Sequence, residues 1–274
     1  MLINGIKIAD EILAELKKEM SDNNIELSLG AVLVGDDPEF KKFVDLKGRA
    51  ANRAGIGFTV YKFPKEIDED ELKKNILEIS NWSDGILVEL PLPKHLNSQE
   101  VLSAIKVEKD VDVLSDDAQE MFYKDKSKVN PPAVEALKVI FEKYSVNLEG
   151  KKAAVFGQGI LIGKPVSHWL EQKGAEVFRI RSITKNPERL SREADIVIAG
   201  VGKPGLIKGA VIKEGAVVID YGYGKKDGKM VGDVDFRSVA SVAGLITPVP
   251  GGMGPILIAA VLKNLIRLNS SNYK

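Results

Sequence analysis

Hydrophobic residues follow two alternating spacings along the first part of the chain. Short, almost unbroken apolar runs are typical of buried strands, and they lie at residues 27–35, 58–63 and 84–90. Between them come stretches with apolar side chains every three or four positions, the spacing of an amphipathic helix: residues 8–20, 38–55 and 68–81. Strands that alternate with helices predict a mostly parallel sheet with helices over its faces.

A second series of the same kind follows residues 116–130, a polar stretch that the pattern predicts to be irregular. A helix is expected at residues 133–144, after Pro131 and Pro132. Strands are then expected at residues 151–157, 175–181, 194–202 and 215–222, with helices at 166–174 and 255–268. The chain is therefore expected to be an α/β protein with a domain boundary between residues 116 and 150.

Composition narrows the classes of function. The 274 residues suffice for one large domain or two modest ones, and 39 Lys plus Arg balance 39 Asp plus Glu. A balanced charge offers no field that would attract nucleic acid or an anionic membrane. The absence of cysteine excludes disulfides and thiol nucleophiles, and two histidines are too few for a His-rich metal site, so we expect no metal.

Nothing in the sequence indicates a secreted or membrane protein. The N-terminal residues carry acids early and have no uninterrupted apolar segment, so we expect no signal peptide. The longest apolar run near the end, residues 256–262, is too short to span a bilayer. We expect a cytoplasmic protein with neither a membrane nor a nucleic-acid partner. His95 is expected in a loop, and His168 in helix packing or on the surface.

A glycine-rich turn is the main chemical signal. Gly157, Gly159 and Gly163 lie where a strand passes into a helix, in a pattern one residue longer than the usual dinucleotide fingerprint. Glycines there let the backbone approach a pyrophosphate, and the N–H groups of the next helix can bind that anion. A turn that only joins strand to helix is the alternative interpretation.

The residues after the following strand bear on the choice of cofactor. NAD enzymes usually carry an acid there for the ribose hydroxyl, whereas this chain has Arg181, Ser182 and Lys185. Cations favour the 2′-phosphate, so NADP is the expected cofactor and NAD the alternative. Arg179 and Arg181 alternate along the strand, and we favour Arg181 as the one that faces the cofactor. A solvated strand end is the other interpretation.

Two later loops are expected at the same edge of the sheet. Residues 200–204 and 220–223 follow the next two strands, and open α/β folds bind ligands at the carboxyl ends of their strands. We assign Tyr223 to cofactor binding on this ground.

Taken together, several motifs resemble those of one enzyme family. They are VGDDPEFKKFVDLK, GILVELPLPKH, KDVDV, GQGILIGKP, AGVGKPGLIKGAVIKEGAVVIDYG, VGDV and ITPVPGGMGP, in this order over nearly the whole chain. The chain thereby resembles the bifunctional methylenetetrahydrofolate dehydrogenase/cyclohydrolases. The resemblance implies a multifunctional enzyme of one-carbon metabolism, which oxidises methylenetetrahydrofolate to the methenyl form with NADP and hydrolyses that product to formyltetrahydrofolate.

The resemblance also implies the architecture. Two α/β domains lie around a cleft, and the last helix returns to the first domain. Residues 1–125 plus 255–274 would form the catalytic, folate-binding domain, and residues 126–254 a Rossmann-like NAD(P)-binding domain. The family forms homodimers.

Site residues follow from the matching motifs. The family's essential lysine falls on Lys47, its tyrosine partner on Phe43, its glutamine on Glu89 and its folate-contacting aspartate on Asp112. The cofactor turn becomes Gly157-Gln158-Gly159, to which Arg181, Ser182 and Tyr223 are added. The turn before the last helix, Pro250, Gly251 and Gly252, is assigned to substrate binding.

Spacing makes this active site physically reasonable. Phe43 and Lys47 are four positions apart, so they share one face of a helix that starts at the carboxyl edge of the sheet. Glu89 ends a strand at the same edge, and Asp112 lies in a polar turn downstream. A ring, an amine and two carboxylates could therefore converge.

Two departures from the family pattern bear on the hydrolysis. Hydride transfer depends mainly on positioning, and Phe43 can still stack on a pterin. Hydrolysis needs a lysine that is neutral part of the time, and an adjacent carboxylate favours the charged form. Glu89 in place of glutamine, and Phe43 in place of tyrosine, therefore predict a weakened cyclohydrolase. The opposing interpretation is that a protonated Glu89 mimics glutamine.

Three alternatives remain from the sequence alone: a monofunctional NAD(P)-dependent methylenetetrahydrofolate dehydrogenase, a non-catalytic nucleotide-binding paralogue, and a dehydrogenase of another substrate class on the same scaffold. The intact Lys47 and Asp112 argue against the non-catalytic paralogue. Turnover with methylenetetrahydrofolate separates all three.

Overall fold

Two compact units make up the computed structural model, which describes residues 1–270. One unit comprises Asp10–Pro132 and Ile258–Lys274, and the other Met1–Ala9 and Ala133–Leu257. We call them the three-stranded unit and the five-stranded unit. The first helix, α1 (Gly5–Asp22), and the last, α10 (Met253–Asn269), each contribute residues to both units. The structure thus contains two α/β units, as the sequence pattern predicts.

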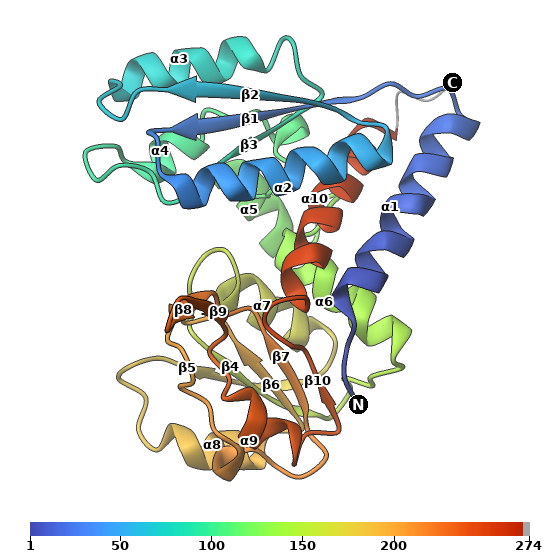
Figure 1. The fold of residues 1–274 in the computed structure, drawn as a ribbon, viewed down its shortest axis with the longest axis vertical. Helices are drawn as coiled ribbons and strands as arrows, with labels where there is room; N and C mark the ends of the chain where they lie inside the picture. Colours follow the sequence, from blue (N-terminus) through green and yellow to red (C-terminus); the bar gives the residue numbers. More distant parts are fainter. Residues whose placement is uncertain (271–274) are drawn as a thin grey trace. The chain divides into compact units, whose positions relative to one another are not determined.

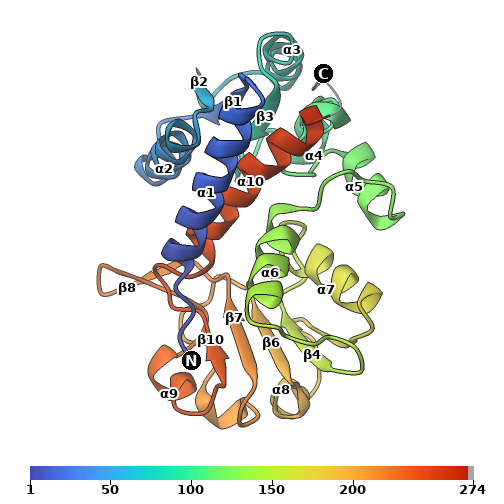
Figure 2. The ribbon, with the colours of Figure 1, turned by 90° about the vertical axis from the view of Figure 1, so that its right-hand side faces the viewer.

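The three-stranded unit is built on a parallel sheet in the order β2-β1-β3. Its strands are β1 (Ser28–Val34), β2 (Gly57–Phe63) and β3 (Gly85–Val88). Its helices are α2 (Pro38–Ala54), α3 (Glu69–Ile79), α4 (Ser98–Leu102) and α5 (Asp116–Tyr123), with a short 3-10 turn at Val107–Lys109. Helices α2 and α3 lie on opposite faces of this sheet (Figure 2).

Local sequence explains where the helices next to this sheet begin. The Asp37 side chain accepts a hydrogen bond from Glu39 N, and Pro38 occupies the first turn of α2, where its missing N–H is no loss. Asp68 caps α3 in the same way, and three acids in its first turn complement the helix dipole. The start of α2 is therefore fixed directly after β1, which places the helix at the carboxyl edge of the sheet.

The five-stranded unit holds a second parallel sheet, in the order β10-β7-β6-β4-β5 (Figure 1). Its strands are β4 (Lys152–Phe156), β5 (Glu176–Ile180), β6 (Ile196–Ala199), β7 (Val217–Asp220) and β10 (Leu245–Ile246). A hairpin, β8 (Gly224–Lys226) with β9 (Lys229–Val231), stands apart from this sheet. The helices are α6 (Pro132–Lys143), α7 (Gly163–Gln172), α8 (Pro187–Glu193) and α9 (Phe236–Ala240), with a 3-10 turn at Gly209–Val211.

Buried aliphatic side chains fill the core of the five-stranded unit. Strands β6 and β7 contribute Val197, Ala199 and Val218, all fully buried, and Ile207 and Val239 close over them from the loop and from α9. Strands that are buried on both faces explain why their sequences read as continuous apolar runs. Among the described residues, no helix is both long and apolar enough to cross a bilayer.

One prediction from the sequence was wrong. Residues 116–130 were expected to be irregular, but Asp116–Tyr123 form α5. Ser115 caps this helix by accepting a hydrogen bond from Ala118 N, and acids occupy its first turn. Ala118 and Phe122 are buried one turn apart. Two buried positions anchor this helix but are too few to show a helical period against a polar background.

Candidate active site and cofactor cradle

Lys47 and Glu89 form an ion pair in the three-stranded unit. Lys47 lies on α2, and Glu89 directly follows β3, so both come from the carboxyl edge of the sheet. Lys47 Nζ is 2.5 Å from Glu89 Oε1, with the side chains 20% and 7% exposed. The sequence argument made the effect of Glu89 on Lys47 conditional on a contact between them, and the structure contains that contact. At such low exposure the pair is weakly screened by solvent.

Asp112 lies close enough to this pair that the charges of Lys47 and Glu89 both affect its carboxyl group. Burial raises the pKa of the Asp112 carboxyl to about 7, against the attraction of Lys47, and the charges of Asp110 and Glu89 raise it further. Asp112 therefore changes its protonation state close to neutral pH. Phe43, half-buried, lies one helical turn before Lys47 on α2. The structure thus brings together an amine and two carboxylates, with an aromatic ring on the same helix as the amine.

Asp110 was missed by the sequence argument and shapes the turn that carries Asp112. It is 1% exposed, and it accepts hydrogen bonds from the backbone N–H groups of Asp112, Leu114 and Ser115 and from the Ser115 hydroxyl. Burial raises the pKa of Asp110, while these hydrogen bonds act in the opposite direction. The two acids of the Asp-Val-Asp sequence therefore differ in role: the first holds the loop and the second lies beside Lys47.

The glycine turn of the five-stranded unit is tightly packed. Gly157 has φ +89°, and a Cβ there would lie 2.6 Å from Gly200 O. A Cβ on Gly163, the first residue of α7, would lie 1.9 Å from Gly157 O. No larger residue fits at either position without moving the backbone, which is the reason for glycine at these two positions. Strand, turn and helix are thus held in backbone contact.

The same turn has the features of an anion cradle. Within residues 1–270, the backbone N–H groups of residues 158–162 donate no hydrogen bond to another protein group. Helix α7 has no acid in its first turn and no side-chain cap. A Cβ on Gly159 would meet nothing within 4 Å, so the turn is open on that side. Free donors at a helix N-terminus suit a pyrophosphate, so this cradle fits a dinucleotide.

Gln158 supports the turn from within. Its side-chain amide donates to Gly157 O at 2.8 Å, and at 3.3 Å to Val155 O and Ser167 Oγ. The sequence assigned Gln158 to cofactor binding. The structure directs its side-chain donors into the turn, which leaves its backbone N–H for a ligand.

The two arginines of β5 and its end have different surroundings. Arg179 forms an ion pair with Glu171 of α7, with the second N–O contact at 2.7 Å. Arg181 follows the strand and is exposed, and within the described part of the chain its guanidinium has no acid partner. Ser182 and Lys185 are exposed beside it. The guanidinium of Arg181, rather than that of Arg179, is available to a 2′-phosphate.

The remaining predicted residues lie in turns of the five-stranded unit. Pro250 is exposed, Gly252 is buried, and Gly251 O accepts a hydrogen bond from Gly5 N at 3.0 Å, which ties the turn to the start of α1. Tyr223, 38% exposed, precedes the β8–β9 hairpin. Lys47, Phe43, Glu89 and Asp112 belong to the three-stranded unit, so the predicted site residues fall into one group per unit.

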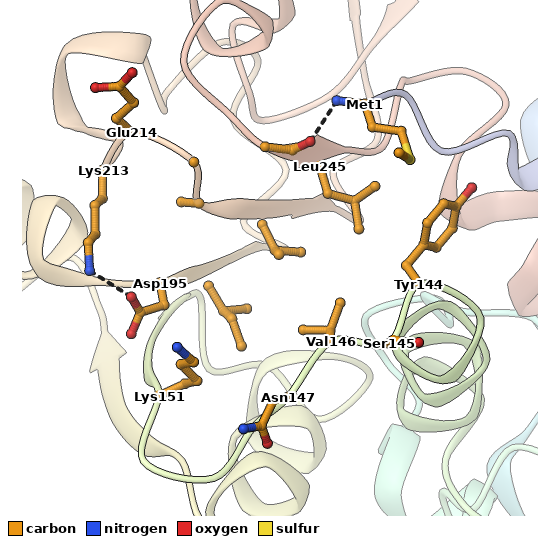
Figure 3. Close-up of a pocket in the computed structure, with 15 residues that line it drawn as sticks. Met1, Tyr144, Ser145, Val146, Asn147, Lys151, Asp195, Lys213, Glu214 and Leu245 are labelled. Carbon is orange, nitrogen blue, oxygen red and sulfur yellow. Dashed lines mark hydrogen bonds and ion pairs between the residues drawn. The ribbon is translucent and has the colours of Figure 1, made fainter.

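A hollow of about 380 Å³ lies at the opposite edge of the five-stranded sheet, at the amino ends of β6, β7 and β10 (Figure 3). Tyr144, Val146 and Leu245 line it, and Lys213 and Asp195 form an ion pair at 2.6 Å on its rim. Lys213 and Asp195 therefore neutralise each other's charge. Open α/β folds bind ligands at the carboxyl edge instead, where the glycine turn lies.

Comparison with known proteins gives matches along the whole chain. The catalytic domain of the tetrahydrofolate dehydrogenase/cyclohydrolase family matches residues 3–112, and the NAD(P)-binding domain of that family matches residues 131–273. The bifunctional protein FolD of Moorella thermoacetica is 43% identical over 272 residues, which are 97% of each chain.

Solved structures similar to this chain belong to the same family. A bifunctional FolD from Campylobacter jejuni, a methylenetetrahydrofolate dehydrogenase/cyclohydrolase, superposes with a TM-score of 0.95 at 33% identity and covers 99% of both chains. The enzyme from Trypanosoma brucei, solved with NADP and an inhibitor, gives a TM-score of 0.93 at 30% identity, covering 99% of this chain and 98% of that one. With the glycine cradle and the Lys47 site in place, the chain belongs to the tetrahydrofolate dehydrogenase/cyclohydrolase family.

Proposed function

We propose that this protein oxidises methylenetetrahydrofolate to methenyltetrahydrofolate with NADP and hydrolyses the product to formyltetrahydrofolate, with a weakened second step. The Lys47–Glu89 ion pair, at 2.5 Å, carries the proposal. It keeps the family's lysine at the carboxyl edge of the sheet and gives that lysine an acidic neighbour. The three-stranded unit would bind folate, and the five-stranded unit NADP, in keeping with the two domains of the family.

The dehydrogenase step depends on the position of the folate carbon that donates the hydride relative to the nicotinamide ring of the cofactor. NADP, when bound, supplies the hydride acceptor. The Phe43 ring is proposed to stack on the pterin, and Asp112 to accept a hydrogen bond from it. Lys47 holds its charge near the reacting carbon, and Glu89 fixes the direction of the lysine side chain. None of these tasks requires a group to give up a proton, so the replacements at positions 43 and 89 leave this step intact.

The hydrolysis is different because a water molecule must lose a proton. A lysine that takes part as a base must first be neutral, and here the Lys47 ammonium is in an ion pair with the Glu89 carboxylate at 2.5 Å. Phe43 offers no hydroxyl to share the proton. The contact therefore favours, as a second candidate function, a dehydrogenase that releases the methenyl product largely unhydrolysed.

Cofactor choice is assigned to Arg181, with Ser182 and Lys185 beside it. A guanidinium at the end of β5, with no acid partner within residues 1–270, suits a phosphate and gives no acceptor for a ribose hydroxyl. The backbone N–H groups of residues 158–162 would hold the pyrophosphate. Tyr223 is proposed to contact the cofactor as well. Pro250, Gly251 and Gly252, in the turn before α10, are proposed to contact the folate substrate.

The test is a two-channel assay. Purified protein is mixed with methylenetetrahydrofolate and NADP or NAD, and reduced cofactor and methenyl product are followed separately. Reduction with accumulation of the methenyl form supports the proposal. Reduction without accumulation, where uncatalysed hydrolysis is slow, means that both steps are fully active. No reduction with either cofactor would refute the proposed function.

Two further parts of the proposal come from the family resemblance: the chain forms a homodimer and works in the cytoplasm. Light scattering on a size-exclusion column, with a mass near twice 29.9 kDa, would support the first part. Fractionation of cells would test the second.

A further inference from the structure

A buried carboxylate holds the loop that follows β6. Asp233 is fully buried, and it accepts hydrogen bonds from three successive backbone N–H groups: Val201 at 2.5 Å, Gly202 at 3.0 Å and Lys203 at 2.5 Å. Three donors from one loop on a single acid form an anion nest that is closed by the protein's own side chain. The inner face of this loop is therefore fixed by Asp233.

The loop forms one wall of the glycine cradle. It begins at Gly200, whose carbonyl oxygen would lie 2.6 Å from a Cβ on Gly157. A Cβ on Gly200 would in turn lie 2.9 Å from Ile162 Cγ2, at the start of α7. Gly202 and Lys203 are exposed on the outer side. A shift of this loop would therefore reach the turn where the pyrophosphate is expected.

A second carboxylate holds the segment that carries Asp233. Asp220, at the end of β7 and 2% exposed, accepts hydrogen bonds from Gly222 N at 2.7 Å, Asp233 N at 3.2 Å and Val234 N at 2.9 Å. The segment lies so close that a Cβ on Gly232 would be 2.0 Å from Asp220 Oδ2. Strand β7 is thereby linked through two acids to the loop after β6.

This linkage lies at the ligand-binding edge of the sheet. A hollow of about 560 Å³ at the carboxyl ends of β7 and β10 is lined by Asp220 and Gly232, and by Thr247 and Val249 of the segment that leads to Pro250. Asp220 and Asp233 are held by backbone N–H groups and have no ion-pair partner among residues 1–270. Hydrogen bonds are directional, whereas apolar contacts are not. The bonds from backbone N–H groups to these two buried carboxylates therefore fix the path of the backbone more strictly than apolar packing would.

We infer that Asp233 is a positioning residue for the cofactor: it holds the Val201–Lys203 loop in the shape that binds NADP, and Asp220 holds Asp233. The inference rests on the proposed NADP dependence. Neither acid touches a reacting atom. Their effect is expected in the affinity for NADP, because the loop borders the cradle.

The test is Asp233→Asn, which turns one acceptor into an N–H group that faces a backbone donor. The Kd for NADP, measured by calorimetry without folate, is expected to rise about tenfold to a hundredfold, as for a lost hydrogen bond to a charged group. Deuterium exchange at the amides of residues 201–203 should accelerate. The kcat at saturating NADP and the KM for folate should change less.

The neighbouring Asp235→Asn is the matched control. Asp235 carries the same charge two positions away, but its side chain makes no capping hydrogen bond at α9. This variant should keep the wild-type Kd and exchange rates. An Asp233→Asn protein with faster exchange but unchanged affinity for NADP would overturn the inference and leave Asp233 a purely structural group. Unchanged exchange would overturn it as well.

A second variant covers the case in which Asp233→Asn does not fold. Gly202 has φ +72°, and a Cβ there would meet nothing within 4 Å, so Gly202→Ala strains the loop without crowding it. It should weaken NADP binding in the same direction, and an unchanged Kd would refute the inference. A wild-type protein that binds no NADP at all would instead refute the proposed function.

Discussion

The Lys47 ammonium is held by the Glu89 carboxylate at 2.5 Å, with both side chains largely shielded from water. Lys47 comes from the helix after β1 and Glu89 from the end of β3, so the contact is fixed by the sheet and not by a mobile loop. It places an acid against the amine on which the hydrolytic half of the reaction depends. The first two predictions follow from this pair.

Replacing Glu89 by glutamine should strengthen the hydrolysis. The amide can still accept a hydrogen bond from Lys47 but no longer stabilises its charge. We expect methenyl hydrolysis to rise about tenfold or more, as for an improved general base, while NADP reduction changes little. The measurement is the decay of added methenyltetrahydrofolate. A Glu171→Gln variant, which alters another ion pair, should show no gain. Equal rates for Glu89→Gln and wild type would contradict the weakened-hydrolase proposal.

Removing the lysine should destabilise the fold as well as abolish hydrolysis. In Lys47→Met the Glu89 carboxylate, 7% exposed, loses its cation, and the free energy of unfolding should fall by about 3 kcal/mol. The double variant Lys47→Met/Glu89→Gln should recover most of that stability while hydrolysis stays absent. Urea unfolding measures the first effect and the methenyl assay the second. A double variant as unstable as the single one would show that Glu89 is not the cause.

Asp112 should make stability depend on pH. Burial raises its pKa from 3.8 to about 7, so between about pH 4 and pH 7 the folded chain keeps a proton that the unfolded chain has released. Stability attributable to Asp112 is therefore present at low pH and is lost as the pH rises toward 7. Asp112→Asn should remove this loss, so its stability relative to wild type should rise by about 4 kcal/mol between pH 4 and pH 8, at about 1.4 kcal/mol per pKa unit.

Unfolding by urea at several pH values checks this prediction. Burial also raises the pKa of Asp220, to about 6, but that residue is present in both proteins and cancels in the difference. Asp117→Asn, an exposed neighbour of the same charge type, serves as the control and should retain the wild-type profile. A pH-independent difference between wild type and Asp112→Asn would disprove the assignment.

Arg181 should set the preference for NADP. Arg181→Ser removes the exposed guanidinium, and the KM for NADP should rise about tenfold to a hundredfold, as for a lost charge-assisted hydrogen bond. The KM for NAD should not change. Arg179→Ser is the matched control because Arg179 is already paired with Glu171. An equal rise for NAD and NADP would point to a general loss of the cradle instead.

Much of the sheet framework follows from the sequence because five strands, β1, β3, β4, β6 and β7, are buried on both faces. Strands β1 and β3 consist of almost unbroken apolar residues, and α2 is bounded by Asp37 and Gly55. Short elements left no comparable signal. Strand β10 has two residues, and α5 has eight with two of them buried. Such elements form because neighbouring segments cover them, which a local pattern does not record.

The sequence argument named some of the site residues and missed others. The assignment of Glu89 came from the motif resemblance, and that of Arg181 from its place at the end of a strand, at the edge of a parallel sheet where loops gather. Asp110 and Asp233 were not predictable, since each acts by binding backbone N–H groups, and these depend on the path of the loop. Two acids in one motif, as in residues 110–113 and 231–235, were the only available hint.

The last residues of α10 complete the three-stranded unit, whose strands are translated before those of the five-stranded unit. Asn264 donates hydrogen bonds to Val111 O and Asn130 O, and a Cβ on Gly85 would lie 2.6 Å from Leu265 Cδ1. These residues are synthesised after the five-stranded unit, so the three-stranded core cannot be completed until the entire five-stranded unit has been synthesised. The gene therefore cannot be cut once into two pieces that each encode a complete folding unit.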